Sequence, residues 1–228
     1  MLESLQKELR ELSDKEKAVI YARFFKTGKG EYGEGDQFIG LTVPQQRKIA
    51  KKYKNLSLED IGRLLRSTIH EFRFTALVIL VQQYKVKREE KYVDLYVRNK
   101  EFVNNWDLVD TSAPYVLGDY LLDKDRSLLF ELAYSNGLWD KRISILSTFA
   151  FIKNNDFTDA IKIAEILLND EHDLIHKAVG WMLREIGNRD REVEEEFLRK
   201  YHKTMPRTML RYAIEKFDEE KRKFYMKK

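Results

Sequence analysis

The chain has 228 residues, of which 43% are hydrophobic and 12% aromatic, enough for a core in one large domain or two small ones. Only 10 residues are glycine and 3 are proline, which argues against an all-β fold with its many turns. Cysteine is absent, which excludes disulfides, thiolate metal sites and a cysteine nucleophile. The net charge of +4 permits nucleic-acid binding but does not require it.

The N-terminal part of the chain predicts short helices around one glycine-rich loop. A first helix is expected over residues 2–12, and Ser13 is expected to cap a second helix in DKEKAVIYARFFKT. After the loop GKGEYGEGDQFIG, Pro44 opens a third helix and Ser57 caps a fourth, LEDIGRLLRS. The amphipathic, acid-containing N-terminus is unlike a signal peptide, and no apolar run approaches the ~18 residues of a membrane span.

A repeat is the most informative feature of the remaining chain. From Glu71 onward the helical periodicity continues almost to the end, and three segments look alike: EFRFTALVIL, DKRISILSTF and IHKAVGWMLREIG. Their basic residues Arg73, Arg142 and Lys177 lie 69 and then 35 residues apart, and a further 34 residues lead to Arg211. The first gap is twice the second, so a missing member is expected near residue 107, inside NNWDLVDTSAP.

A period of 34 or 35 residues is typical of stacked helix pairs of the TPR or HEAT kind. The TPR pattern of Trp, Gly, Tyr, Ala and Pro is not present, so we expect an all-α fold: an α-solenoid of HEAT-like helix pairs with a concave basic groove. Residues 1–228 are expected to form a single domain, in which 1–70 hold the N-terminal helices and the loop and 71–228 hold the repeats.

The repeat also predicts a row of positive charge. Equivalent positions of a solenoid line up on one surface, which gives Arg142, Lys177 and Arg211 a common side, expected to be the concave one. A phosphate backbone is the obvious partner for such a row. The acidic face of a partner protein is the alternative, and ordinary solvated or salt-bridged side chains fit the pattern equally well.

Two short motifs resemble binding sites but lack the required context. GKGEYG, residues 28–33, fits G-x-G-x-x-G, yet no strand precedes it and no helix follows directly, so we interpret it as a flexible loop. HDLIH places His172 and His176 at zinc-like spacing, but Asp173 replaces the glutamate of the metalloprotease motif and no third ligand is evident. We therefore expect no metal and no cofactor.

The segment NNWDLVDTSAP places Trp106 and Asp110 one helical turn apart, on one face of a helix. An aromatic surface beside a carboxylate suits a planar cationic guest. Alternatively, Trp106 packs in the core and Asp110 caps a helix that begins near Pro114. If Asn104 or Asn105 is the cap instead, Asp110 lies inside the helix and Pro114 at a kink.

Two residues further along the chain extend this pattern. Arg142 begins the next inner helix of the expected stack, and Trp181 lies one turn after Lys177 in the following one. In a stacked array two indoles, one carboxylate and one guanidinium would converge on the concave face. From the residues alone, core packing of the two tryptophans is at least as good an explanation.

Several separated blocks, in the same order, resemble the DNA alkylation repair family, the HEAT-like-repeat alkylpurine DNA glycosylases. These blocks are FIGLTVPQQRKIAKKY, NNWDLVDTSAPYVLGDYL, LWDKRISILSTF, HKAVGWMLREIG and MPRTMLRYAIEKF, and they cover most of the chain. The resemblance implies hydrolysis of the N-glycosidic bond of cationic N3- and N7-alkylated purines in double-stranded DNA, without flipping of the base. It matches Asp110 to the family's catalytic carboxylate, Trp106 and Trp181 to its site tryptophans, and Arg142 to its site arginine.

Further DNA contacts are expected from residues on repeat helices and near the Pro44 helix start, where free backbone N–H groups could meet a phosphate. For each of them an ordinary surface role fits as well. These residues are Lys177, Arg184, Arg207, Arg211, Gln45, Gln46 and Arg47.

We expect a monomeric enzyme of the cytoplasm that associates with the nucleoid through DNA and with no membrane. Two other functions stay open: a non-catalytic HEAT-like module that binds DNA by shape or backbone, and a protein-interaction scaffold. The complete set of Trp, Asp, Arg and Trp favours catalysis over the binding module. Only the scaffold predicts an absence of salt-dependent DNA affinity.

Overall fold

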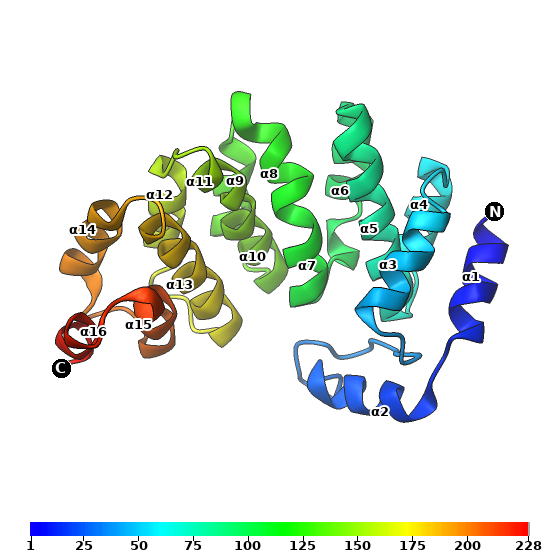
Figure 1. Cartoon of the computed structure of the whole chain (residues 1–228), viewed down its shortest axis with the longest axis horizontal. Helices are drawn as coiled ribbons and strands as arrows, with labels where there is room; N and C mark the ends of the chain where they lie inside the picture. The colour runs from blue at the N-terminus through cyan, green and yellow to red at the C-terminus, as the bar shows by residue number, and fades with distance from the viewer. Residues whose placement is uncertain (228) are drawn as a thin grey trace. The chain divides into compact units, whose positions relative to one another are not determined.

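The computed structural model describes residues 1–227 and is all-α, as the sequence predicts (Figure 1). Within these residues no β-strand forms, and an isolated parallel bridge joins Gln37 to Ile69. The chain divides into two compact units, Met1–Val116 and Leu117–Lys228. The single solenoid domain expected over residues 1–228 stays a prediction.

The first unit contains seven α-helices and two 3₁₀ turns among its residues, all of which are described. They are α1 (Leu2–Glu11), α2 (Lys15–Phe24), α3 (Val43–Lys52), α4 (Leu58–Leu65), α5 (His70–Lys87), α6 (Glu90–Arg98), η1 (Lys100–Phe102), α7 (Trp106–Ser112) and η2 (Ala113–Tyr115).

Local capping chemistry sets most of these helix starts. The Asp14 carboxylate, not Ser13, accepts from the Lys17 backbone N–H, so the expected cap of α2 is wrong by one residue. Thr42 and Gln45, on either side of Pro44, form a capping box at the start of α3. Ser57 caps α4 as predicted, by accepting from the Asp60 N–H at 3.1 Å.

Helix α5 forms the centre of the first unit. All of its first twelve residues are buried, and α3, α4, α6 and α7 pack against it. Its Glu71 carboxylate accepts from the backbone N–H groups of Ile39, Gly40 and Leu41, at 2.8 to 3.3 Å. Gly40 has φ +84°, and a Cβ there would lie 2.0 Å from the Asp14 carbonyl oxygen. The glycine-rich loop is therefore tied closely to α2 and α5.

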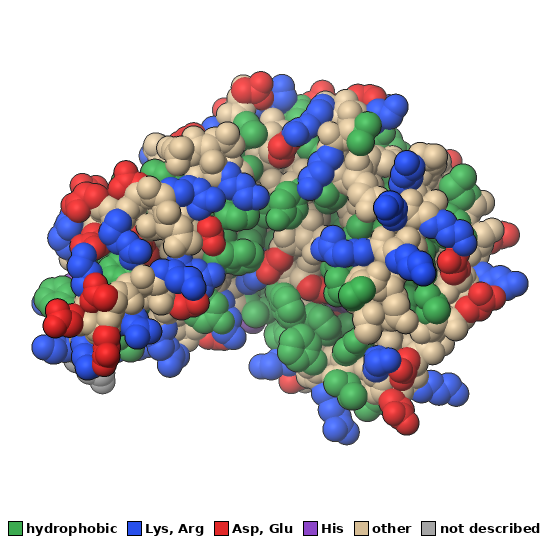
Figure 2. Space-filling view, in the orientation of Figure 1, with side chains coloured by type: hydrophobic (Ala, Val, Ile, Leu, Met, Phe, Trp, Pro, Cys, Tyr) green, Lys and Arg blue, Asp and Glu red, His purple; other side chains and the backbone are tan. Residues whose placement is uncertain are grey.

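Helix α2 buries none of its residues fully, and its apolar side chains Val19, Ile20 and Phe24 are exposed. Figure 2 shows apolar side chains gathered at the surface over this part of the first unit. None of the helices described over residues 1–227 combines the length and the apolar character that a membrane crossing needs.

The second unit is built around α13 (Asp173–Gly187), against which α10, α12, α14 and α15 pack. At Gly180 the backbone of α15 comes so close that an added Cβ would lie 2.4 Å from the Met209 carbonyl oxygen. The other elements of this unit are α8 (Leu117–Tyr120), η3 (Leu121–Asp123), α9 (Ser127–Tyr134), α10 (Leu138–Ser147), α11 (Phe149–Lys153), α12 (Thr158–Ile166), α14 (Arg191–Tyr201), α15 (Arg207–Ala213), η4 (Ile214–Lys216) and α16 (Glu219–Met226).

Candidate active site

The start of α7 is fixed by its own sequence. The Asn105 side-chain oxygen accepts from the Trp106 backbone N–H at 2.9 Å, so Asn105 is the cap and Trp106 the first helical residue. Asp110 therefore lies inside the helix, one turn after Trp106, and Pro114 lies in the 3₁₀ turn that follows. The alternative in which Asp110 caps a helix near Pro114 is wrong.

Trp106 belongs to a cluster of aromatic rings contributed by α2 and the loop after it. Its ring is stacked on Phe25, with centroids 5.3 Å apart and planes inclined by 21°. Phe24 meets it edge to face at 5.9 Å, and Phe25 is stacked in turn on Phe38 at 5.0 Å. Such contacts fix ring orientation as well as burying apolar area.

A cavity of about 490 Å³ opens between α2, α3, α5 and α7, wholly within the first unit. Asp107 and Asp110 line it together with Trp106. The other lining residues are mostly apolar or aromatic: Ile20, Tyr21, Phe24, Phe25, Phe38, Leu41, Val43 and Phe74. The remaining lining residues carry polar groups: Gln46, Arg47, His70, Glu71 and Thr111. An apolar cavity with a few polar groups is the usual form of a ligand site.

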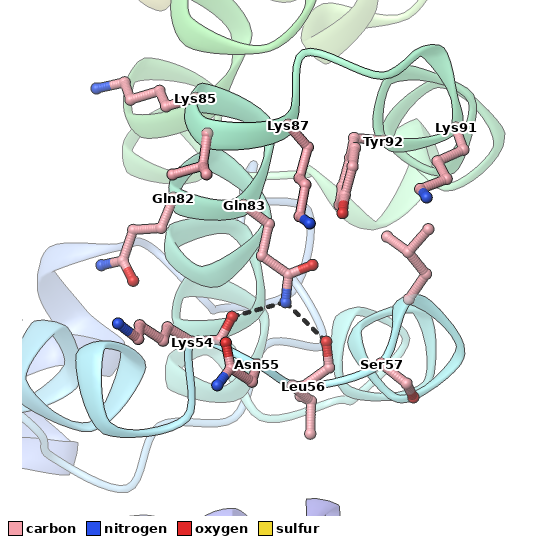
Figure 3. Close-up of a pocket in the computed structure, with 12 residues that line it drawn as sticks. Lys54, Asn55, Leu56, Ser57, Gln82, Gln83, Lys85, Lys87, Lys91 and Tyr92 are labelled. Carbon is pink, nitrogen blue, oxygen red and sulfur yellow. Dashed lines mark hydrogen bonds between the residues drawn. The ribbon is translucent and has the colours of Figure 1, made fainter.

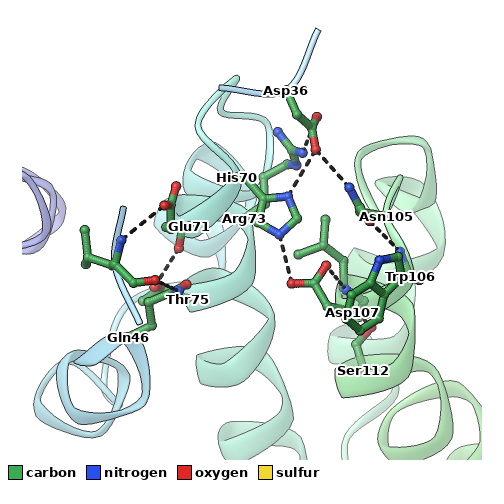
Figure 4. A network of polar contacts seen from close by, with 12 residues as sticks. Asp36, Gln46, His70, Glu71, Arg73, Thr75, Asn105, Trp106, Asp107 and Ser112 are labelled. Carbon is green, nitrogen blue, oxygen red and sulfur yellow. Dashed lines mark hydrogen bonds and ion pairs between the residues drawn. The ribbon is translucent and has the colours of Figure 1, made fainter. Parts of the chain in front are cut away.

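A buried polar network lies beside this cavity (Figure 4). His70 Nδ1 lies 3.0 Å from Asp36 Oδ2, and His70 Nε2 lies 2.9 Å from Asp107 Oδ2. Arg73 donates to Asp36 Oδ1 at 2.6 Å and to the Ser67 carbonyl at 2.9 Å. Asn105, the cap of α7, also donates to Asp36, at 3.4 Å. The network joins the loop, the start of α5 and the start of α7.

The charges of this network stabilise one another. Burial opposes ionisation of Asp36, but the hydrogen bond from His70 and the Arg73 charge outweigh it and lower the Asp36 pKa. Burial alone would lower the pKa of His70, but the Asp107 and Asp36 carboxylates raise that pKa to about 9. At neutral pH the network therefore contains an imidazolium.

Two candidate site residues lie in the second unit. The Arg142 side chain in α10 is buried, with 4% of the residue exposed, and its Nη1 donates to the Leu174 carbonyl at 2.6 Å. Trp181 in α13 is half-buried, donates from its indole N–H to Glu185 at 3.2 Å and lies 6.1 Å from the Phe149 ring. The expected convergence of these two residues with Trp106 and Asp110 stays a prediction.

Comparison with known proteins supplies the family. The family model described as DNA alkylation repair enzyme matches residues 5–217. The chain belongs to the DNA alkylation repair enzyme family. A solved structure described as a predicted DNA alkylation repair enzyme from Enterococcus faecalis is similar, with a TM-score of 0.72 over 91% of this chain and 97% of that one. At 16% sequence identity, this likeness shows the fold alone. No curated protein matches the chain.

Of the three expected DNA contacts near Pro44, the structure leaves only Arg47 well exposed. Gln45 accepts from the Thr42 backbone N–H in the capping box. Gln46 is 4% exposed and donates to the Leu41 carbonyl, so its amide serves the fold of this repair-family member. Arg47 stands at the cavity, with its guanidinium over the Phe74 ring at 5.8 Å.

The expected cations of the second unit differ in exposure. Arg211 and Arg207 are exposed, and Arg207 donates to the Met226 carbonyl. Lys177 is partly exposed and pairs with Asp173 at 2.7 Å, and Arg184 pairs with Glu215. Because Arg142 is buried, the predicted exposed row of Arg142, Lys177 and Arg211 is not formed as expected.

A second hollow of the first unit, about 750 Å³, is larger but has different chemistry (Figure 3). Lys54, Lys85, Lys87 and Lys91 lie around it, and Gln83 donates to the Lys54 and Leu56 carbonyls at its base. None of its described lining residues is an acid or a histidine. Its lysines suit an anion, but it offers no carboxylate or imidazole that could assist hydrolysis. We therefore place the candidate active site at the cavity lined by Trp106 and Asp110.

The HDLIH motif has a structural role. His172 Nδ1 accepts from the Leu174 N–H at 3.1 Å and thereby caps α13. Across residues 1–227, no group of three or more His, Asp or Glu side chains is arranged to hold a metal ion.

Sequence reasoning missed the polar network and the aromatic partners of Trp106. Asp36 and Phe38 lie in the glycine-rich loop, and the pattern there predicts only flexibility. His70 precedes the repeat segment that begins at Glu71. The one signal in the sequence that pointed to this network was Asp107, a second acid inside NNWDLVD next to Trp106.

Proposed function

We propose that this protein is a monofunctional DNA glycosylase that hydrolyses the N-glycosidic bond of cationic N3- and N7-alkylated purines in duplex DNA, without flipping the base. The observation that carries the proposal is the placement of Asp110 and Trp106 on one cavity of a DNA alkylation repair enzyme. The cavity provides a carboxylate in an aromatic, mostly apolar setting, where its charge acts strongly.

The chemistry requires little more than this. Alkylation at N3 or N7 puts a positive charge on the purine and makes it a good leaving group, so its departure needs little acid catalysis. Positive charge then develops on the deoxyribose, as in glycoside hydrolysis. Asp110 stabilises that charge and orients the attacking water, while the Trp106 indole packs on the electron-poor lesion nucleotide.

The second unit contributes two residues to the proposal. Trp181 is proposed to pack on the lesion nucleotide as a second indole. The DNA-backbone role expected of Arg142 would require its guanidinium, in a residue that is only 4% exposed, to reach the surface from the Leu174 carbonyl. Both roles are testable with Trp181→Ala and Arg142→Lys. Arg142→Lys keeps the charge but removes the planar fork that bonds the Leu174 carbonyl. A role on the DNA backbone predicts weaker DNA binding together with slower excision, whereas a role confined to packing predicts lower stability with unchanged DNA affinity.

No strand cleavage is expected. Among the described residues that line the cavity none is a lysine, so the site offers no amine for a Schiff base. Hydrolysis should therefore leave an intact strand with an abasic site, which distinguishes a monofunctional glycosylase from a glycosylase with lyase activity.

The test is base release from duplex DNA that carries defined lesions. We expect release of 7-methylguanine and 3-methyladenine, and no release of uracil or hypoxanthine, whose glycosidic bonds are not activated by charge. The product strand should break only after alkali treatment. Release of uracil at a rate comparable to 7-methylguanine would refute the proposed mechanism.

The second candidate is a non-catalytic module that binds DNA by shape or backbone. It is favoured by the lysine-lined hollow and by the exposed Arg47, which provide positive charge for DNA phosphates but no catalytic acid or base. This module would bind DNA with an affinity that falls as salt rises, and would release no base from any lesion. A protein-interaction scaffold would neither bind DNA in a salt-dependent way nor release a base.

A further inference from the structure

His70 has an arrangement of partners that a neutral imidazole cannot satisfy. Both of its ring nitrogens lie within hydrogen-bond distance of a carboxylate oxygen, Nδ1 at 3.0 Å from Asp36 and Nε2 at 2.9 Å from Asp107. Ionised carboxylates only accept hydrogen bonds, and a neutral imidazole has a single N–H to donate. With both carboxylates ionised, this geometry places a proton on each ring nitrogen and makes His70 an imidazolium.

The surroundings keep this imidazolium away from water and balance its charge. The His70 side chain is 3% exposed, and its ring lies against Phe38 at 4.5 Å and Phe25 at 5.0 Å. The charged groups that face it are Asp36 from the loop, Asp107 from α7 and Arg73 from its own helix. Two carboxylates and two cations thus form a buried cluster without net charge.

Through these contacts His70 holds the start of α7 in two ways. Its Nε2 binds Asp107, whose neighbours in the same helix are Trp106 and, one turn on, Asp110. Its ring also contacts Phe25, the residue on which the Trp106 indole is stacked. Both nitrogens are occupied by carboxylates, so His70 itself cannot take part in proton transfer to DNA.

We propose that the His70 imidazolium is a positioning residue that fixes the first turn of α7 and so sets the orientation of Trp106 and Asp110 at the cavity. The kinetic consequence of this inference rests on the proposed glycosylase function. Its structural part stands on the network alone.

Loss of the second proton has a definite effect. The raised pKa of His70, about 9, means that the cluster is complete at neutral pH and is weakened as the pH rises through that value. Above it the neutral ring donates to one carboxylate and turns a lone pair toward the other. The Asp107 contact or the Asp36 contact is then lost, and the network that holds the start of α7 is weakened.

The first experiment reads the protonation state directly, in the wild-type protein. NMR with ¹⁵N-labelled histidine should show both His70 ring nitrogens protonated from pH 6 to pH 8, with deprotonation near pH 9. The indole N–H signal of Trp106, assigned with Trp106→Phe, should move with the same midpoint. A neutral His70 ring at pH 7.5, or a Trp106 signal that ignores the His70 titration, overturns the inference.

The second experiment reads the consequence for base release. In His70→Gln we expect kcat to fall about 10- to 100-fold at pH 7.5, the size of effect that misplacement of a catalytic group produces. The KM for lesion DNA should stay within about twofold, because no DNA-contacting group is removed. The matched control is His202→Gln, which removes a half-buried histidine bonded to the Leu198 carbonyl in the second unit, and it should keep wild-type kcat.

The pH profile separates positioning from a general loss of folding. Wild-type kcat should decline above pH 9 with the His70 midpoint, whereas His70→Gln has no imidazolium to lose and should lack that decline. Because both proteins act on the same substrate, any pH dependence of the substrate appears in both profiles and cancels in the comparison. Equal declines overturn the inference. If the wild type releases no base at any pH while the Trp106 signal follows His70, the proposed function fails and the positioning role stands.

Discussion

The Trp106 indole lies nearly parallel to the Phe25 ring, 5.3 Å away, and this pair connects the end of α2 to the start of α7. Phe25 is half-buried between Trp106, Phe38 and His70, so it determines where the indole face points. The candidate site therefore depends on a residue that makes no direct contribution to the proposed chemistry.

Replacement of Phe25 should test this dependence. Phe25→Leu removes the stacking surface, so we expect a loss of about 1–2 kcal/mol of unfolding free energy and a lower kcat for base release. Phe224→Leu is the matched control, because that residue is 61% exposed, does not line the cavity and should cost much less stability. Chemical denaturation and base release measure the two effects, and equal losses in both variants would argue against the role of Phe25.

DNA affinity should depend on Arg47. This exposed arginine stands at the cavity over Phe74, so Arg47→Ala should weaken binding to duplex DNA and reduce the slope of log affinity against log salt by about 1. Arg63→Ala is the control in the same unit, since Arg63 pairs with Glu59 one helical turn away. Fluorescence anisotropy at several salt concentrations gives both slopes. An unchanged slope for Arg47→Ala would remove it from the interface.

Different surroundings predict opposite effects for one glycine in each unit. At Gly180 a Cβ would meet the Met209 carbonyl at 2.4 Å, so Gly180→Ala must push α15 away from α13 and should cost about 1–3 kcal/mol. At Gly62 the nearest atom is the movable Leu95 Cδ1 at 3.2 Å, and Gly62→Ala in α4 should gain up to about 1 kcal/mol of helix propensity. Thermal unfolding should show Tm shifts of opposite sign.

A buried acid gives the second unit a pH-dependent stability. Burial raises the pKa of Glu194 to about 8, and its Oε1 has no hydrogen-bond partner among the described residues. The folded state therefore holds a proton that the unfolded state releases, so this contribution is present below pH 4.5 and lost as the pH rises through about 8. Glu194→Gln should unfold at a higher temperature than the wild type at pH 8.5, by roughly 2–4 °C for each kcal/mol.

The same variant has a built-in control at low pH. At pH 5 the wild-type carboxyl group is protonated in the folded state, so Glu194→Gln and the wild type should unfold at similar temperatures. An advantage of equal size at both pH values would show that the gain comes from packing and that Glu194 does not titrate as described.

Features set by neighbouring residues could be predicted from the sequence. The all-α class follows from scarce glycine and proline, and the cap at Ser57 follows from its place next to the helix start. For α7 the sequence left Asn104, Asn105 and Asp110 open as caps, and the structure selects Asn105. Ser13 and Asp14 are both good caps, and local propensity could not choose between them.

Features that join distant residues could not be predicted. Asp36, His70 and Asp107 lie 34 and 37 residues apart, and no periodicity connects them. The burial of Arg142 and Gln46 was missed for the same reason, because charged and amide side chains are normally exposed unless a specific partner is present. Here the Leu174 and Leu41 carbonyls are those partners.

The most direct test of the central proposal compares Asp110→Asn with the wild type on duplex DNA containing 7-methylguanine. The substitution keeps the shape of the side chain and removes its charge, so we expect base release to fall at least about 100-fold, as with loss of other charge-stabilising groups. Binding to the same DNA should stay within about twofold, because asparagine adds no repulsion to phosphate. Normal release by Asp110→Asn would contradict the assignment of Asp110 as the residue that stabilises the developing charge.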